Sequence, residues 1–386
     1  MATHMAASKS LPHILCVVGA RPNFMKIAPI MRALNEFKSE LTVSLIHTGQ
    51  HYDVAMNQQY FEALGIPKPD VNLEVGSGSH ATQTAEVMRR FEPILDEKPP
   101  SAILVVGDVN STLACALVAT KKGIPVIHVE AGLRSFDRSM PEEINRILTD
   151  QISDLLFTTE RSGQENLLRE GIAASRIQFV GNVMIDTLRH NLERAIAVNQ
   201  ILLNAGKVMP AISHTQYAVL TLHRPSNVDD PKTLQILLET IRKISVRLPV
   251  IFPLHPRTHE KIEKFGLGAM LDVPEILQLP PMGYLEMLGL LKGARLVLTD
   301  SGGIQEETTA LGVPCITLRN NTERPVTVEE GTNTIAGQDP VKILEIFEGI
   351  MHNGGKVGKI PEYWDGQASK RIALAIRGWL KSDFRS

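Results

Sequence analysis

The stretch from Leu296 to Leu318 constrains the fold more tightly than any other part of the sequence. Its first four residues end at Thr299 and form a run typical of a strand buried on both faces of a parallel sheet. A Ser-Gly-Gly turn and a helical run follow, and we expect the helix to stop at Gly312, with Pro314 just beyond it. A second apolar run completes a β-α-β unit. The pattern predicts the α/β class, in which helices cover an open parallel sheet.

The turn of this unit is a candidate phosphate site. Ser301, Gly302 and Gly303 lie between the carboxyl end of a strand and the amino end of a helix. Free backbone N–H groups and the positive end of the helix dipole favour a phosphate there. Glu307 follows about one turn later and could reach a diol such as a ribose. The alternative is a purely structural turn whose acidic neighbours stabilise the helix start.

The composition narrows the class of protein. A length of 386 residues suggests two domains, and 43 % hydrophobic with 21 % charged residues is ordinary for a globular chain. The net charge of −2 gives no support for a nucleic-acid or membrane partner, and no run of about 18 apolar residues is present. Cys16, Cys115 and Cys315 are odd in number and scattered, and the first ten residues lack a signal-peptide core. We therefore expect a cytoplasmic protein without disulfides.

Two α/β domains of similar construction are expected, because 102–129 repeats the strand, polar turn, helix and Gly-x-Pro order of the first stretch described. We place an N-terminal Rossmann-like domain over 11–190 and a C-terminal one over 205–365, facing each other across a central cleft. A last helix, within 366–386, could pack back on either domain, the N-terminal one being the assignment we favour. The segment 190–214 is the expected crossover.

The local elements follow from apolar periodicity. Strands are expected at 13–18, 41–46, 102–106, 126–129, 155–158, 177–180, 217–222, 250–254, 275–279, 296–299 and 314–318. Helices are expected at 54–64, 81–97, 233–246, 284–292 and 366–382, with a long loop over 65–80. Nearly every strand ends in polar residues, and ligands of open parallel sheets lie at that edge.

Charged residues follow the strands of the first domain. Arg21 and Lys26 come after the first strand and suit a phosphate or phosphosugar; the alternative is surface charge on a helix start, which the helix dipole disfavours. Asp108, Glu130 and Glu142 follow neighbouring elements, and carboxylates brought together raise each other's pKa and can serve as acid and base. Asp108 could instead cap a helix, and Glu142 could complete a capping box that begins at Ser139.

Two histidines occupy matching places in the second domain. His223 and His255 each follow a strand, with an arginine nearby, and histidine can act as acid, base or phosphate donor. The alternative for each is a structural loop histidine. Gly76 to Ala81 match the loose dinucleotide fingerprint but follow no convincing strand, so we expect no nicotinamide site. The sequence has no P-loop and no His-Glu-x-x-His motif, and no cysteine pair has zinc-site spacing.

Taken together, these motifs resemble the non-hydrolysing UDP-N-acetylglucosamine 2-epimerases from about residue 13 to 380. The matching segments are Gly19-Ala-Arg21-Pro22 with Lys26, His47-Thr-Gly-Gln50-His51, Gly107-Asp108 with Ser111-Thr112, His128-Val-Glu130-Ala-Gly-Leu-Arg134, Pro141-Glu142-Glu143-x-Asn145-Arg146, His223-Arg224, Asp300-Ser-Gly-Gly-x-Gln305-Glu306-Glu307 and Thr322-Glu-Arg324-Pro325.

The resemblance implies a glycosyltransferase-B-like fold and interconversion of UDP-N-acetylglucosamine and UDP-N-acetylmannosamine without NAD or a metal. In the family a base removes the C2 proton as UDP leaves C1, and UDP then re-adds to the glycal. Carried onto this chain, the acid/base candidates are Asp108, Glu130 and Glu142, with Lys26 beside them. The implied ligand contacts are Arg21, His223, Ser301, Gly302 and Gly303 to the diphosphate, Glu307 to the ribose, Arg324 in the nucleotide site, and Met282 and Met287 near the uracil.

Departures from the family pattern bear on the substrate. After His223-Arg224 this chain has Pro225-Ser226-Asn227, where the better-known members carry a Glu-Asn pair. The loop from Arg134 to Pro141 is shorter than in many members. Asp53 replaces a Gln that in some members contacts an activating second substrate molecule, so no such activation is expected. A related substrate, such as a UDP-2,3-diacetamido sugar or its uronic acid, is therefore an alternative to UDP-N-acetylglucosamine.

The resulting hypothesis is a homodimeric cytoplasmic 2-epimerase that takes a UDP-sugar and feeds surface-polysaccharide synthesis. A glycosyltransferase of the same fold is an alternative that would need an acceptor. A non-catalytic UDP-sugar-binding protein is a further alternative, and it would exchange no solvent deuterium into C2.

Overall fold

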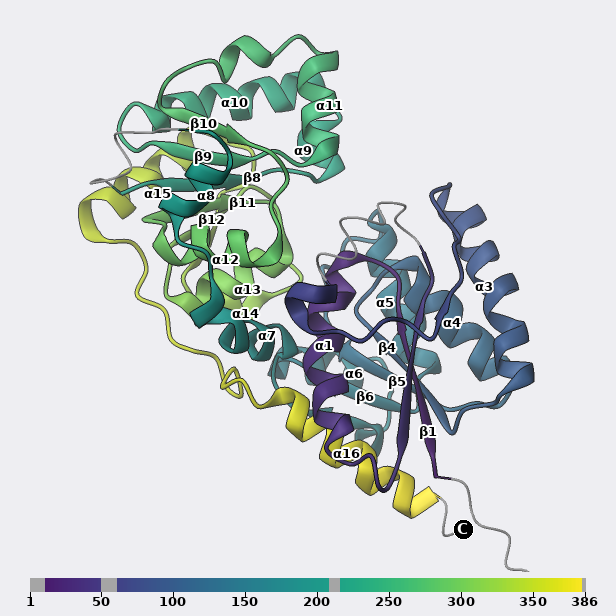
Figure 1. Cartoon of the computed structure of the whole chain (residues 1–386). Coiled ribbons are helices and arrows are strands. Elements are labelled where there is room, and N and C mark those ends of the chain that lie inside the picture. The colour runs from purple at the N-terminus through teal and green to yellow at the C-terminus, as the bar shows by residue number, and fades with distance from the viewer. Residues whose placement is uncertain (1–10, 50–60, 208–215, 384–386) are drawn as a thin grey trace, which may run out of the picture.

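The computed structural model describes residues 11–49, 61–207 and 216–383, and these form two parallel sheets in two lobes (Figure 1). Every strand pair recorded in either sheet is parallel. The predicted α/β class, with two Rossmann-like sheets, is confirmed. Within the described ranges, no helix is both long enough and apolar enough to cross a membrane.

Within the described residues the two sheets have seven and six strands, and the order in the first is β3-β2-β1-β4-β5-β6-β7. Their bounds are His13–Val18 (β1), Thr42–His47 (β2), Val71–Asn72 (β3), Ala102–Val106 (β4), Val126–Ala131 (β5), Leu155–Thr158 (β6) and Ile177–Phe179 (β7). The second sheet has six strands in the order β10-β9-β8-β11-β12-β13. Their bounds are Ala218–Thr221 (β8), Val250–Pro253 (β9), Ile276–Leu279 (β10), Leu296–Thr299 (β11), Cys315–Thr317 (β12) and Asn333–Ile335 (β13).

Helices connect and cover the strands. Among the described residues of the first half of the chain, the helices with given bounds are Arg21–Asn35 (α1), His80–Glu97 (α3), Asn110–Lys121 (α4), Pro141–Ile152 (α5), Arg161–Arg169 (α6), Val183–Asn191 (α7) and Val198–Asn204 (α8). In the second half they are Pro225–Val228 (α9), Pro231–Ser245 (α10), Pro256–Lys264 (α11), Tyr284–Gly293 (α12), Gly302–Leu311 (α13), Pro325–Glu329 (α14), Pro340–Asn353 (α15) and Ala368–Asp383 (α16). Short 3-10 turns lie at Ala174–Arg176, Leu192–Arg194 and Gly268–Met270.

In each sheet the order in which the chain adds strands reverses once, and the position of this reversal predicts where a ligand binds. In the first sheet the chain winds outward from the β1/β4 pair, and in the second from the β8/β11 pair. Strands β4 and β11 are buried along their whole length, as central strands covered on both faces should be. Ligands of such sheets bind outside the carboxyl ends of the strands at this point of reversal. The exits of β1, β4, β8 and β11 are therefore the places to examine.

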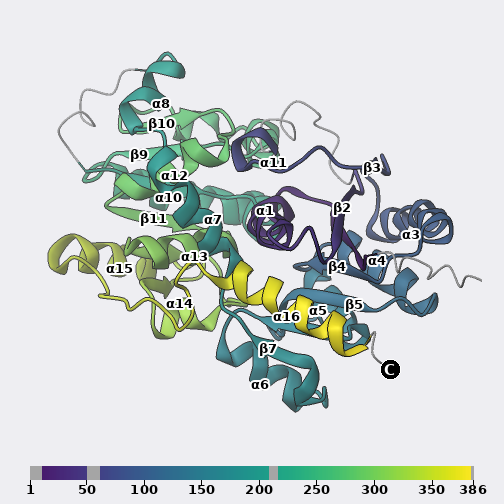
Figure 2. The same ribbon diagram turned by 60° about the horizontal axis from the view of Figure 1, so that its bottom comes forward.

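The last helix returns to the first lobe, where α16 packs against α1 and α7 (Figures 1 and 2). Ile372, Ile376 and Leu380 of α16 are buried in the same apolar cluster as Ile27 and Leu34 of α1. Asp186 of α7 fixes the start of α16 by accepting hydrogen bonds from two backbone N–H groups, at 3.1 and 2.7 Å. The C-terminal helix is thus anchored to the lobe in which the chain begins.

Several local expectations need revision. Part of 65–80 is not loop, because Val71–Asn72 forms the edge strand β3. The crossover contains α8, and Ile196 joins it to the second lobe by a backbone hydrogen bond to Leu285 at 3.1 Å. The helix expected at 54–64 falls mostly outside the described residues.

Candidate active site

Lys26 lies at the centre of the first lobe's strand exits. It is on the second turn of α1 and only 4 % exposed, so for Lys26 the alternative of surface charge is wrong. Its ammonium Nζ is 2.6 Å from Glu130 Oε2. A Cβ added to Gly107, at the exit of β4, would lie 2.9 Å from the same Nζ, and Gly107 has φ +69°. The glycine therefore makes room for the lysine beside the strand end.

Glu130 is held in a backbone conformation that few residues other than glycine adopt. Its φ is +73°, and the β5–β6 pairing shifts register between Val129 and Ala131, so Glu130 occupies a bulge. A bulge bends the strand and redirects one side chain, and the left-handed conformation costs about 1–3 kcal/mol. The side chain is nonetheless buried. The surrounding structure thus holds this carboxylate in place against local strain.

Arg324 joins the two lobes at this carboxylate. Its Nη2 donates to Glu130 Oε1 at 2.9 Å, its Nη1 to Glu323 Oε1 at 2.8 Å, and its Nε is 2.6 Å from Glu306 Oε1. Burial would lower the pKa of Arg324, but these carboxylates outweigh it and raise the pKa well above its usual value. Asn182 of the first lobe also donates to Glu306, at 2.9 Å. A fixed cation from the second lobe therefore sits against the strand exit of the first.

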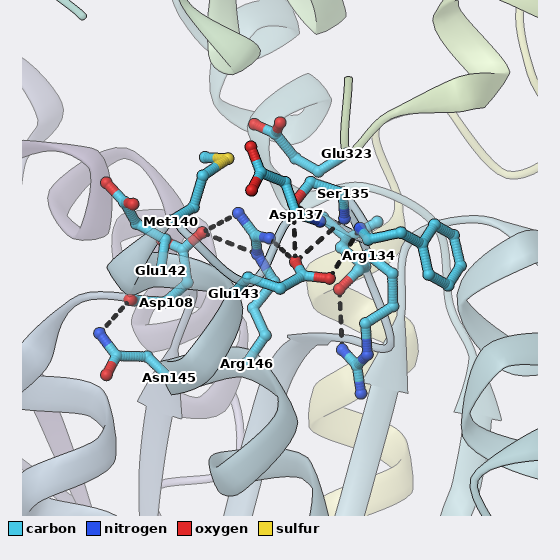
Figure 3. Close-up of polar contacts among 12 residues, drawn as sticks. Asp108, Arg134, Ser135, Asp137, Met140, Glu142, Glu143, Asn145, Arg146 and Glu323 are labelled. Atoms are coloured by element: carbon cyan, nitrogen blue, oxygen red, sulfur yellow. Dashed lines mark hydrogen bonds and ion pairs between the residues drawn. The ribbon is translucent and has the colours of Figure 1, made fainter. Parts of the chain in front are cut away.

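Asp108 is held by a different arginine (Figure 3). Its Oδ2 accepts from Arg146 Nε at 3.0 Å, and Arg146 also pairs with buried Glu143. Burial would raise the pKa of Asp108, but the charges of Arg146, Lys26 and Arg324 outweigh it and lower the pKa below its usual value. For Asp108 the predicted upward shift by neighbouring carboxylates is therefore wrong, since the cations dominate.

The helix-cap alternatives for two of the carboxylates are also wrong. The residue that caps α4 is Val109, with no side-chain cap bond, so Asp108 does not serve there. Met140 precedes α5, again with no side-chain cap bond, and Ser139 instead bonds to Asp137. The side chain of Glu142 is partly exposed and lies 3.4 Å from Arg224 Nη1 of the second lobe.

Asp300 organises the histidine loop of the second lobe. This fully buried carboxylate accepts hydrogen bonds from the backbone N–H groups of His223 and Arg224 and from Asn227 Nδ2, each at 2.9–3.1 Å, and lies 2.9 Å from His223 Nδ1. Burial would raise its pKa, but the His223 contacts and the backbone donors lower it. His255 caps α11 and has its ring 5.4 Å from that of His223. The loop thus presents His223 from a rigid base.

The start of α13 lies beside Arg324. A Cβ on Gly302 would come within 2.5 Å of Glu323 Oε1 and 2.9 Å of Arg324 Nη1, so the glycine is required by the packing of that pair. At Gly303 the nearest atom to a Cβ is Met184 Cε, at 3.7 Å. Ser301 uses its backbone N–H to reach Thr299 Oγ1 at 3.0 Å. The first N–H groups of a helix lack an intrahelical acceptor, and those of Gly302 and Gly303 can serve an anion.

Glu307 lies further along α13 and is buried. Burial raises its pKa to about 7, opposed by a hydrogen bond with Tyr284. The first turn of α13 contains no acidic residue, and the next carboxylate, Glu306, pairs with Arg324. The alternative in which acidic residues stabilise the helix start is therefore wrong.

Four further sequence-predicted residues are less closely defined. The backbone of Arg21 begins α1, but its side chain lies outside what the structure describes. Met282 and Met287 are partly buried against the apolar cluster beneath α12. Asp53 lies outside the described residues.

Sequence reasoning missed four buried charged residues. All stood within recognised motifs but received no role, although each contacts one of the candidate groups: Arg146, Asp300, Glu306 and Glu323. The spacing of Glu143 and Arg146, three residues apart on one helix, was a usable signal for an ion pair. No local pattern indicates that Glu323 is buried.

Glu160 gives a test of the electrostatics around this cluster. Burial raises its pKa to about 8, and among the described residues its Oε2 has no hydrogen-bond partner. A carboxyl whose pKa is raised on folding destabilises the protein as pH rises from its unfolded pKa to its folded one. Glu160→Gln should therefore stabilise the protein above about pH 8 by up to about 4 kcal/mol and change little at about pH 5. Thermal unfolding across that range checks this, and equal losses in both proteins would contradict it.

Comparison with known proteins adds to this geometry. The family model described as UDP-N-acetylglucosamine 2-epimerase matches residues 32–377. A UDP-N-acetylglucosamine 2-epimerase of Methanococcus maripaludis is 43 % identical over 368 residues, covering 95 % of this chain and 98 % of the relative. A UDP-2,3-diacetamido-2,3-dideoxy-D-glucuronate 2-epimerase of Pseudomonas aeruginosa is 41 % identical, covering 93 % and 98 %.

A solved structure is similar over the same length. It is the crystal structure of Methanocaldococcus jannaschii UDP-GlcNAc 2-epimerase in complex with UDP-GlcNAc and UDP, with a TM-score of 0.86 and 42 % identity, covering 94 % of this chain and 99 % of that one. The predicted family is confirmed by the model match and by these identities. The chain therefore belongs to the UDP-N-acetylglucosamine 2-epimerase family.

Proposed function

We propose that this enzyme interconverts UDP-N-acetylglucosamine and UDP-N-acetylmannosamine by elimination and re-addition of UDP. The observation that carries the proposal is the placement of Glu130. It lies at a strand exit of one lobe between Lys26 of the same lobe, at 2.6 Å, and Arg324 of the other, at 2.9 Å. Acid/base groups and cations for a leaving diphosphate are thereby brought to one place.

The chemistry requires this combination. The C2 proton of the sugar has no adjacent carbonyl and is not acidic, so its removal must accompany cleavage of the bond from C1 to the diphosphate oxygen. The C2–H electron pair becomes the C1=C2 double bond, and the C1–O pair leaves with UDP. Positioned cations and helix N–H groups that stabilise the departing diphosphate then make the main contribution to lowering the activation barrier. The return of UDP to C1, with a proton delivered to the other face of C2, completes the epimerisation.

Roles follow from the groups available. Asp108, whose pKa is lowered by Arg146 and its other cationic neighbours, is ionised, which is the state in which a carboxylate can accept a proton. Glu130 and Glu142 are the partners from which the returning proton would come. The proposed ligand contacts are Arg21, Lys26, His223, Ser301, Gly302 and Gly303 to the diphosphate, Glu307 to the ribose, Arg324 in the nucleotide site, and Met282 and Met287 at the base.

The proposed working unit has two domains, 11–190 and 205–365, with the helix within 366–386 returning to the first. Closure of the two over the ligand would keep UDP from escaping while it is detached. We further propose that the enzyme is a cytoplasmic homodimer that feeds polysaccharide synthesis.

Proton NMR in D2O tests the function directly. UDP-N-acetylglucosamine is incubated with the protein, with EDTA and without NAD. The proposal predicts UDP-N-acetylmannosamine that carries deuterium at C2. Free N-acetylmannosamine would indicate a hydrolysing enzyme, and an unchanged spectrum would refute the substrate assignment.

A second candidate substrate is a UDP-2,3-diacetamido uronic acid. It is favoured by the 41 % identity to a relative named as a 2-epimerase of that sugar. The same NMR assay with the diacetamido UDP-sugar distinguishes the two, because the preferred substrate exchanges its C2 proton faster. A glycosyltransferase would instead leave C2 unchanged and consume the sugar only when an acceptor is added.

Glu307 supplies a pH-dependent prediction for ligand binding. Its pKa is raised to about 7 by burial, opposed by its bond with Tyr284. Ribose hydroxyls that donate to this carboxyl favour its ionised form, so binding lowers the pKa and releases a proton. Near pH 7 we expect UDP-N-acetylglucosamine to release about half a proton, with affinity rising as pH rises through about 7.

Titration calorimetry in two buffers of different protonation enthalpy measures that proton. The diphosphate of a UDP-sugar has no proton to lose near neutral pH, so it does not obscure the signal. Glu307→Gln should bind without proton release. Equal release by both proteins, or proton uptake, would remove Glu307 from the ribose site.

A further inference from the structure

His128 lies beneath the candidate site and has had no role so far. It is on β5, two residues before Glu130, and its side chain is fully buried. Its Nδ1 is 2.7 Å from Asp150 Oδ1, and its Nε2 is 2.9 Å from the carbonyl oxygen of Gly107. The ring therefore bridges α5 and the exit of β4 through the interior of the first lobe.

Both partners of the ring can only accept a hydrogen bond. A backbone carbonyl carries no proton. Asp150 Oδ2 already accepts from the backbone N–H of Gly132 at 3.1 Å and lies 2.8 Å from Arg134 Nη1, and the arginine's charge favours the ionised carboxylate. A neutral imidazole has one N–H, whereas the imidazolium has two. With an ionised Asp150 and a carbonyl as its two partners, the geometry points to a ring that donates from both nitrogens, a buried cation with Asp150 as its counter-ion.

The carbonyl oxygen that accepts from His128 Nε2 belongs to Gly107, whose backbone is in the left-handed region. Gly107 has φ +69° and packs against Lys26 Nζ, and the next residue is Asp108. The backbone N–H of Gly107 donates to the carbonyl oxygen of Val129, the residue before Glu130, at 3.0 Å. The peptide units around Gly107 are thus tied to β5 at two points. A shift of this turn would move Asp108 and the floor under Lys26 together.

We propose that His128 is a positioning residue, an imidazolium that fixes the Gly107 turn and through it the carboxylate of Asp108 and the ammonium of Lys26. The inference rests on the proposed function, because it assigns these two groups to the reaction. In the described part of the chain, the ring pairs with Asp150, Asp150 pairs with Arg134, and Arg134 also pairs with Glu170 at 2.6 Å. This chain of alternating charges runs from the interior to a partly exposed carboxylate.

The protonation of the ring can be measured without any variant of His128. Nitrogen NMR of protein labelled at its histidine ring nitrogens reports whether each nitrogen carries a proton. The proposal predicts, at neutral pH, a histidine that is protonated on both nitrogens, and Asp150→Asn should convert that signal to a neutral ring. A neutral ring at His128, with one protonated and one unprotonated nitrogen, would overturn the proposal. This outcome is independent of whether the protein epimerises anything.

Kinetics test the positioning role. His128→Phe keeps a ring of similar size but loses both hydrogen bonds, and we expect kcat to fall about 30-fold, with KM for the UDP-sugar changing less than about threefold. Asp150→Asn should lower kcat in the same direction. Thr149→Ala is the matched control, because it is a buried polar truncation on the same helix beside Asp150; its kcat should stay within about twofold of the parent.

The outcomes separate the possible roles of His128. If His128→Phe lowers the melting temperature but the folded enzyme keeps its kcat, the residue is merely structural and the proposal fails. If His128→Phe does not fold, Asp150→Asn decides: a neutral ring with unchanged kcat overturns the proposal, and a neutral ring with lowered kcat supports it. If the parent enzyme itself shows no C2 exchange, the proposed function fails while the ring measurement still stands.

Discussion

Glu130→Gln is expected to lower kcat by about a thousandfold. The substitution keeps the shape of the side chain but removes the charge and the ability to take up or release a proton. Glu130 lies between Lys26 and Arg324 and is held at φ +73°, a conformation whose cost is consistent with a role at the site. Steady-state rates of C2 deuterium exchange measure the effect, with circular dichroism to confirm folding.

Glu40→Gln is a matched control for this variant. Glu40 also contacts two cations, Arg377 and Lys381 of α16, but all three side chains are partly exposed and none belongs to the candidate site. The kcat of Glu40→Gln should stay within about twofold of the parent value. A Glu130→Gln enzyme that retains more than about a tenth of the parent rate would remove Glu130 from the acid/base set.

Arg324→Ala is expected to destabilise the protein by about 3–5 kcal/mol as well as to abolish activity. The guanidinium contacts Glu130, Glu306 and Glu323, all of which are buried. Glu323 depends on this pairing, because burial would raise its pKa whereas Arg324 and Arg319 hold it well below its usual value. Without Arg324, buried carboxylates lose their main counter-ion and must take up protons or leave the interior.

Urea unfolding measures this loss, and a surface arginine gives the comparison. Arg247 pairs with Glu348 where both side chains are 53 % exposed. Arg247→Ala should cost less than about 1 kcal/mol, because exposed ion pairs contribute little. Comparable losses in the two variants would mean that Arg324 is not the counter-ion of a buried cluster. The loss in Arg324→Ala should also shrink at low pH, where the carboxylates are protonated.

The fold was predictable because it depends on local periodicity. The apolar runs that form β4 and β11, and the Gly-Val-Pro that ends α13, are visible in any single window of the sequence. Strand exits gave Asp108, Glu130 and His223 as candidates for the same reason, since polar residues stand directly after apolar runs.

The electrostatics of the site were not predictable from those patterns. The strand-exit pattern grouped Glu130 with other carboxylates, and only the family resemblance put Lys26 beside it. Its ion-pair partners are that lysine, 104 positions earlier, and Arg324, 194 positions later, which no pattern indicated as its partner. The capping box at Ser139 and Glu142 satisfies the local rule, but Ser139 bonds to Asp137 instead. The capping box thus lost to a competing local bond, whereas the pairing of Glu130 with Arg324 joins two lobes and lies in no single window of the sequence.

Positional isotope exchange would reveal whether UDP leaves C1 and then returns between the lobes. UDP-N-acetylglucosamine is prepared with 18O in the oxygen that bridges C1 and the β-phosphorus, and phosphorus NMR follows the label. If UDP is detached and its β-phosphate turns before it re-adds, the label scrambles into the non-bridging β-phosphate oxygens while the sugar is epimerised, and this is the expected result. Epimerisation with the label still entirely in the bridge would argue against elimination and re-addition of UDP.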